Sequence, residues 1–223
     1  RISEDDPELY HESIWIMAGR GCVYQCSFCV NSVLIPMNKG KGKFVRMRSP
    51  ERIIEELKYK TAKCKNSKEF TYIDEVFGVT NSWIMDFHEK YKDCGLNHSF
   101  SINLVPKQIK ERNIAPLAEV GLTFIQTGIQ SGVDHVRNDI LNRPGSSQDV
   151  YEKAVLMKQY NIMPLCDMIL ENPFETAKDM ADSIKLLLSL PKPLYLNTFK
   201  LQFYPSYPMS KRALEAGYIT EDD

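Results

Sequence analysis

Along this chain, β-prone apolar segments alternate with helix-like segments six times. The strand-like segments cover residues 13–18, 70–73, 99–104, 122–129, 163–170 and 195–203. Capping residues and amphipathic spacing indicate helices at residues 49–57, 80–95, 106–120, 147–160, 176–190 and 211–216. Repeated strand–helix units with right-handed crossovers predict an α/β domain with one parallel sheet. This pattern alone allows either an open doubly wound sheet or a barrel.

Length and composition are those of one folded domain. Of the 223 residues, 43% are hydrophobic, which is enough for a substantial core, so we expect residues 1–223 to form a single domain. Because the sequence opens at Arg1 and closes on Asp223 without an obvious terminal cap, we expect a segment excised from a longer protein. The 28 basic and 29 acidic residues nearly cancel, so nucleic-acid binding is not indicated. No apolar run reaches the roughly 18 to 20 residues of a membrane-spanning helix, so no membrane partner is expected.

Three cysteines, Cys22, Cys26 and Cys29, lie within eight residues on a loop after the first strand. Loops at the C-terminal ends of strands are where α/β folds place their sites. A cubane iron–sulfur cluster takes thiolate ligands at such short spacings, and three of them leave one iron open. Zinc normally needs four protein ligands, or three and a water, and no second Cys-x-x-Cys or His pair follows. With six cysteines and no secretory segment, reduced thiols and a cytoplasmic location are expected.

The spacing Cys-x3-Cys-x2-Cys, with Phe28 directly before the third cysteine, resembles the signature of the radical S-adenosylmethionine (radical SAM) superfamily. The resemblance implies a 4Fe-4S cluster on Cys22, Cys26 and Cys29, with SAM bound to the open iron. It also implies reductive cleavage of SAM to a 5′-deoxyadenosyl radical that abstracts hydrogen from a substrate, in an oxygen-sensitive enzyme. An external one-electron reductant of the flavodoxin or ferredoxin type is then expected. The implied fold is α/β, a partial (β/α)6 TIM-like barrel with parallel strands.

The resemblance assigns SAM contacts to residues at the ends of the second and third strands. Phe28 lies in the cluster loop, and Asp74 and Glu75 follow the second strand, where acidic residues face the SAM amino group. The alternative for both carboxylates is a solvated strand end. Asn103 ends the third strand and resembles a polar residue near the ribose, although a lone Asn before a loop is weak evidence.

The fourth strand ends in Gly-Ile-Gln-Ser-Gly, which resembles the Gly-Ile-Glu-Ser segment of the methylthiotransferase and cobalamin-associated branch. Gln130 and Ser131 are therefore expected SAM contacts, although Gln130 lacks the charge of the usual Glu. Arg143, or alternatively Arg137, is expected to bind the SAM carboxylate, and we favour Arg143 because it follows a short helix. An exposed helix position is the alternative for either arginine.

Two further segments bear on the subfamily. Residues 46–51, Arg-Met-Arg-Ser-Pro-Glu, resemble the segment after the cluster loop in cobalamin-associated members. The end of the fifth strand departs from the usual Gly-x-Pro-Gly-Glu-Thr, because Glu171 and Phe174 replace both glycines. Since no Asp-x-His-x-x-Gly motif is present, cobalamin is expected only through a domain absent from this chain. Methyl or methylthio transfer to an unknown substrate is expected, and a non-catalytic zinc or electron-transfer iron–sulfur domain is the alternative.

Two features have no assigned role. The basic run from Lys39 to Arg48 is either a lid over an anionic substrate or a solvated loop. Cys166, on the fifth strand, is by default a small buried residue, with a catalytic position facing the barrel interior as the alternative.

Overall fold

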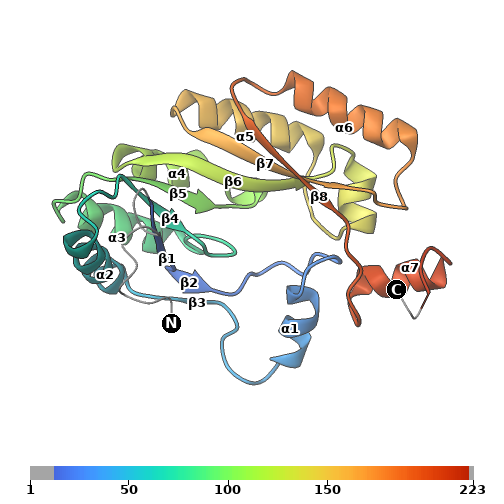
Figure 1. Ribbon diagram of the computed structural model, residues 1–223, viewed down its shortest axis with the longest axis horizontal. Helices are drawn as coiled ribbons and strands as arrows, with labels where there is room; N and C mark the ends of the chain where they lie inside the picture. Colours follow the sequence, from blue (N-terminus) through green and yellow to red (C-terminus); the bar gives the residue numbers. More distant parts are fainter. Residues whose placement is uncertain (1–12, 221–223) are drawn as a thin grey trace.

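The computed structural model of the protein describes residues 13–220. Its main sheet has six strands, each paired in parallel with the next along the chain (Figure 1). The strands are β1 (Ser13–Ile16), β4 (Glu69–Tyr72), β5 (Ser99–Asn103), β6 (Leu122–Gln130), β7 (Met163–Leu170) and β8 (Tyr195–Lys200). A doubly wound sheet reverses its strand order at a switch point, and this sheet does not. The predicted partial (β/α)6 barrel is therefore confirmed.

Helices connect successive strands of this sheet. They are α2 (Pro50–Lys63), α3 (Asn81–Lys92), α4 (Glu111–Glu119), α5 (Ser147–Gln159) and α6 (Ala177–Ser189). Their starts follow the capping residues of the sequence. Ser146 and Thr176 each form a capping box with an aspartate three residues later, which satisfies backbone N–H groups that a helix start leaves unpaired.

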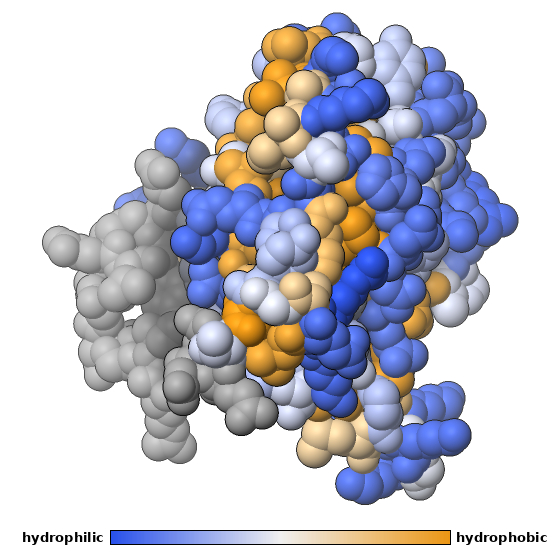
Figure 2. Space-filling model, turned by 90° about the vertical axis from the view of Figure 1, so that its right-hand side faces the viewer, coloured by the Kyte–Doolittle hydropathy of each residue, from blue (hydrophilic) through white to orange (hydrophobic). Residues whose placement is uncertain are grey.

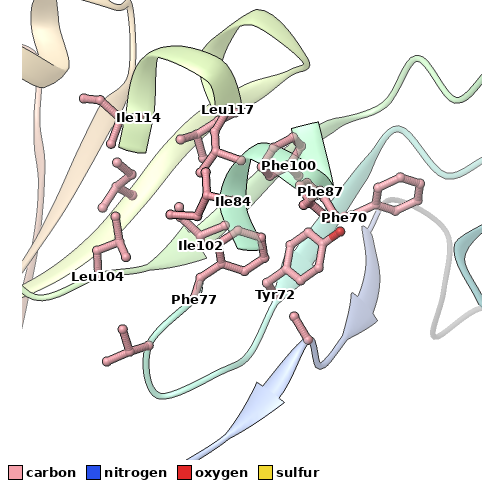
Figure 3. Close-up of a cluster of buried hydrophobic side chains, with 14 of the residues drawn as sticks. Phe70, Tyr72, Phe77, Ile84, Phe87, Phe100, Ile102, Leu104, Ile114 and Leu117 are labelled. Atoms are coloured by element: carbon pink, nitrogen blue, oxygen red, sulfur yellow. The ribbon is translucent and has the colours of Figure 1, made fainter. Parts of the chain in front are cut away.

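The largest core cluster lies between the first strands and their helices (Figure 3). Tyr72 of β4 and Phe100 of β5 pack against Phe87 of α3, and all three side chains are at most 1% exposed. The Tyr72 and Phe87 rings pack edge to face at 6.0 Å between centroids. Because this core covers the outer face of the sheet, the opposite face is left for polar side chains.

A small substructure beside the sheet was not predicted. β2 (Gly19–Arg20) pairs antiparallel with β3 (Arg46–Met47), and helix α1 (Asn31–Met37) lies in the loop that joins them (Figure 1). The predicted first strand therefore ends at Ile16 rather than at residue 18, because the chain leaves the parallel sheet to pair with β3.

Other boundaries differ from the prediction in detail. The helix expected over residues 106–120 is divided into a short 3-10 turn η2 (Pro106–Gln108) and α4, because the fully buried Ile109 is extended between them. A π-helical turn, η3 (Val136–Ile140), follows β6. Strand β8 ends three residues early, and the last helix, α7 (Pro208–Glu215), begins three residues early. Within residues 13–220, no helix is both long and apolar enough to cross a membrane.

Candidate functional site

A cleft of about 210 Å³ opens where the loops after the first four strands converge. All three thiols of the cysteine loop line it, together with the predicted contacts Phe28, Glu75, Asn103, Gln130 and Arg143. Residues far apart in sequence therefore meet at the C-terminal ends of the strands, as the barrel fold predicts. Asp74 and Ser131 do not line this cleft.

The cysteine loop is held by backbone contacts with distant segments. The Ser27 N–H donates to the Leu141 carbonyl at 3.0 Å, and the Ser27 hydroxyl donates to the Ile140 carbonyl at 2.7 Å. On the other side, the Met209 N–H donates to the Ser27 carbonyl at 3.1 Å. The end of η3 and the start of α7 thus fix the loop while the thiols remain turned to the cleft.

Arg143 supplies positive charge among the thiols. Its Nε donates to the Gly128 carbonyl at 2.8 Å, and its Nη1 lies 3.5 Å from the Cys26 sulfur. Burial raises the pKa of Cys22 and of Cys29, and the Arg143 guanidinium acts in the opposite direction on both. Arg137 is 3% exposed, forms a 2.9 Å ion pair with Asp134 and lies outside this cleft. The structure thus brings Arg143, and not Arg137, to the cysteines.

The two acidic residues after β4 have different surroundings. Glu75 is exposed, lines the cleft and accepts a 3.0 Å hydrogen bond from the Gly21 N–H. Asp74 is 1% exposed, and its carboxylate accepts hydrogen bonds from the N–H groups of Ala18 and Gly19. Burial raises the pKa of Asp74 to about 6, and the two backbone donors only partly oppose this. Asp74 therefore holds the chain between β1 and β2 and does not face the cleft.

The amide and hydroxyl residues also separate into two groups. Asn103 lines the cleft while its side chain donates to the Asp74 carbonyl at 2.8 Å. Gln130 lines the cleft at an irregularity in the pairing of β6 with β7, with a φ of 69°. Ser131 is 1% exposed and donates to a Glu175 carboxylate oxygen at 2.7 Å, so it joins β6 to the start of α6 instead.

Sequence reasoning missed a polar cluster on the inner face of the sheet. The Asp167 carboxylate on β7 accepts hydrogen bonds from Gln126 of β6, at 2.9 and 3.1 Å, and from Asn197 of β8, at 3.2 Å. Burial raises the pKa of Asp167. Asp167 and Gln126 line the same cleft as the thiols. The period-2 alternation of β7 was the available signal, since residues 165, 167 and 169 share the face opposite Cys166.

Cys166 lies on the other face of β7. It is 1% exposed and packs with Ile129, Val150 and Ala154 between the sheet and its helices. Burial raises the pKa of this thiol to about 11, so it stays protonated at neutral pH. Of the two interpretations of Cys166, the structure supports the small buried residue.

The donor chemistry of the cleft fits an iron–sulfur cluster. Three thiols line one cleft, as ligation of a cluster requires, and the Arg143 guanidinium lies beside them. In the part of the chain that the structure describes, no three His, Cys, Asp or Glu side chains are close enough to hold a single metal ion. The ligand role of the three cysteines therefore stays a prediction, which their shared cleft supports.

Comparison with known proteins defines the class. Residues 16–187 match the radical SAM superfamily, so the chain belongs to that superfamily. It is 25% identical over 175 residues to a Pyrococcus horikoshii protein named as an uncharacterized methyltransferase, a match that covers 78% of this chain and 36% of that protein. It is 26% identical over 224 residues to the bacteriochlorophyllide d C-8(2)-methyltransferase of Chlorobaculum tepidum, a match that covers 95% of this chain and 47% of that protein. The chain thus spans less than half the length of either curated relative.

A solved structure shares the fold. The radical SAM methyltransferase TsrM from Kitasatospora setae, with tryptophan and a SAM analogue bound, superposes with a TM-score of 0.75 at 16% identity, over 92% of this chain and 39% of that one. TsrM has also been solved with cobalamin and a 4Fe-4S cluster bound. Membership of the superfamily implies a 4Fe-4S cluster and SAM for this chain, and it favours the enzyme over the non-catalytic metal domain.

Proposed function

We propose that this chain is the catalytic domain of a radical SAM methyltransferase. The observation that carries the proposal is one cleft in which Cys22, Cys26 and Cys29 meet polar side chains of strands β5, β6 and β7 and of the loop after β4. Methyl transfer is favoured over methylthio transfer because both curated relatives are named as methyltransferases. The substrate stays unassigned, because side chains lining the barrel and further domains determine it.

The cysteines and the charged side chains of the cleft have chemical roles in this proposal. The three thiolates hold the cluster, and the cluster and SAM together supply reductive cleavage of SAM. Arg143, whose Nη1 lies 3.5 Å from the Cys26 sulfur, binds the SAM carboxylate, because one guanidinium presents several donors. Glu75 carries the negative charge that pairs with the ammonium group of SAM.

The remaining polar side chains of the cleft form hydrogen bonds with uncharged groups of SAM and with its hydrogen-bond donors. The amides of Asn103 and Gln130 can each donate to and accept from ribose hydroxyls. The Asp167 carboxylate, already oriented by Gln126 and Asn197, accepts hydrogen bonds from SAM. We assign no direct contact to Asp74 or Ser131, which hold neighbouring backbone in place.

Two partners belong to the proposal. An external one-electron reductant of the flavodoxin or ferredoxin type would reduce the cluster. Cobalamin would act through a domain outside this chain, which is supported by the cobalamin bound in TsrM, a protein of which this chain covers 37%.

The test is anaerobic reconstitution with iron and sulfide, followed by dithionite and SAM. We expect thiolate–iron absorbance at roughly 400 nm and reductive cleavage of SAM to 5′-deoxyadenosine and methionine, with dithionite supplying the electron. Cys26→Ala should abolish both, whereas Cys64→Ala, outside the cleft, should retain both. Absence of a cluster in the wild-type protein, or SAM cleavage by Cys26→Ala, would contradict the proposal.

A further inference from the structure

A second cavity, of about 270 Å³, adjoins the cysteine cleft on the side of the β2–β3 pair. Four cations line it, Arg20, Lys41, Lys43 and Arg46, against one carboxylate, Glu75. None of these four cations forms an ion pair with another residue of the described part, 13–220. Three cations of the basic run, Lys41, Lys43 and Arg46, are exposed and lie around one cavity.

The β2–β3 pairing places two of these charges directly opposite each other. Arg20 and Arg46 are cross-strand partners in a sheet that has only two residues per strand. Like charges at directly opposed positions destabilise an antiparallel pair. By contrast, Arg48, two residues further along, is neutralised by Glu56 at 2.6 Å. An anion between Arg20 and Arg46 would convert their repulsion into two attractions.

A buried amide also opens onto this cavity. Asn31, the first residue of α1, is 3% exposed and lines both this cavity and the cysteine cleft. Its side-chain amide is not among the fully enclosed polar groups without a partner in residues 13–220, so it is open to the space of the cavity. An amide at a cavity wall can donate a hydrogen bond to an oxygen atom of a ligand that binds there.

We propose that this cavity binds an oxyanion group, a phosphate or a carboxylate, carried by the substrate. Arg20 of β2 and Arg46 of β3 bind the oxyanion, and Lys41 and Lys43 of the glycine-containing loop add positive charge. The side chain of Asn31 donates a hydrogen bond to it. Because Asn31 and Glu75 line both cavities, a substrate held here by its anionic end extends towards the thiols. That orientation rests on the proposed function of the cleft, but the oxyanion site itself does not.

The test is calorimetric titration of the purified chain, without cluster or SAM, using inorganic phosphate and, separately, acetate. We expect saturable binding of at least one of them, weakened by about tenfold or more in Arg46→Gln and in Lys43→Gln. Binding of phosphate alone indicates a phosphorylated substrate, and binding of acetate alone indicates a carboxylate substrate. The double variant Lys58→Gln/Lys65→Gln, which removes two exposed charges outside the cavity, should bind as the wild type does.

Thermal melting with and without the anion provides a second test, which applies even if the variants bind no anion in the calorimeter. Without anion, Arg46→Gln should melt no lower than the wild type, because it removes the opposition with Arg20. With the anion that binds, the wild type should gain thermal stability and Arg46→Gln should not. No saturable binding of either ion, or equal weakening in the Lys58→Gln/Lys65→Gln control, would overturn the site. Either result would leave SAM cleavage unaffected, so this failure is distinguishable from failure of the proposed function.

Discussion

Asp74 shows how burial can outweigh hydrogen bonding at a single residue. Two backbone N–H donors would by themselves lower the pKa of its carboxyl, yet removal from water raises that pKa to about 6. A raised folded-state pKa means that the native protein holds this proton more tightly than the unfolded chain does. The stabilisation is therefore complete below the unfolded pKa and is lost as pH rises to about 6.

The comparison of wild type with Asp74→Asn isolates this effect. The free energy of unfolding of the wild type, relative to the variant, should fall by roughly 2 to 3 kcal/mol between about pH 4 and pH 6 and stay flat above. Urea unfolding at a series of pH values measures it. A difference that rises with pH would mean that the two amide donors dominate instead.

Cys166 and Asp167 are neighbours in sequence with opposite surroundings. Cys166 packs in the outer core, and Asp167 lines the cleft. We expect Cys166→Ala to cost about 1 kcal/mol of stability, because it leaves a small cavity, and to leave SAM affinity unchanged. Asp167→Asn should change stability by less than about 1 kcal/mol and weaken SAM binding about tenfold, since it removes a charged acceptor.

Urea unfolding and equilibrium dialysis with SAM measure the two effects on the same proteins. If Cys166→Ala weakened SAM binding and Asp167→Asn did not, the assignment of the two faces of β7 would be reversed.

At the scale of elements, the six-stranded sheet could be predicted from the sequence, and the two-stranded β2–β3 sheet could not. Six strands of four to nine residues have a recognisable pattern of apolar residues, and caps such as Ser146 and Thr176 mark helix starts. Strands β2 and β3 have two residues each, too few for any period. The separation of Glu75 from Asp74, and of Arg143 from Arg137, depends on tertiary contacts that no local pattern contains.

Gly21 joins the small sheet to the cysteine loop. Its φ is 87°, and a Cβ there would lie 2.7 Å from the Phe44 carbonyl oxygen. Gly40 has a similar φ of 80°, but nothing lies within 4 Å of its Cβ position. Both Gly→Ala changes carry the strain of a left-handed backbone, about 1 to 2 kcal/mol, and only Gly21→Ala adds a clash with backbone.

Gly21→Ala should therefore lose clearly more stability than Gly40→Ala, and it should reconstitute less iron per chain because the clash displaces the loop of Cys22. Urea unfolding and iron analysis of both variants measure this. Equal losses in the two variants would contradict this and would show that the backbone at Phe44 moves to accommodate the added methyl group.

On the scale of the whole molecule, the barrel is open between β1 and β8. These strands form the two ends of the sheet and do not pair with each other. The β8 edge leaves Tyr195, Leu196 and Phe199 between 46% and 59% exposed. From the side that carries α7, the surface shows apolar patches among charged side chains (Figure 2). The polar inner face, with Asp167 at its centre, is thus reachable from an open side rather than enclosed.

The fold and the cleft together make one central claim, that the three cysteines and the strand-end polar residues form one site for a cluster and SAM. Electron paramagnetic resonance of the dithionite-reduced, reconstituted protein with and without SAM tests this most directly. We predict the signal of a reduced 4Fe-4S cluster whose g values shift when SAM is added, because SAM occupies the iron that the three cysteines leave open. A cluster signal that SAM leaves unchanged would contradict the account.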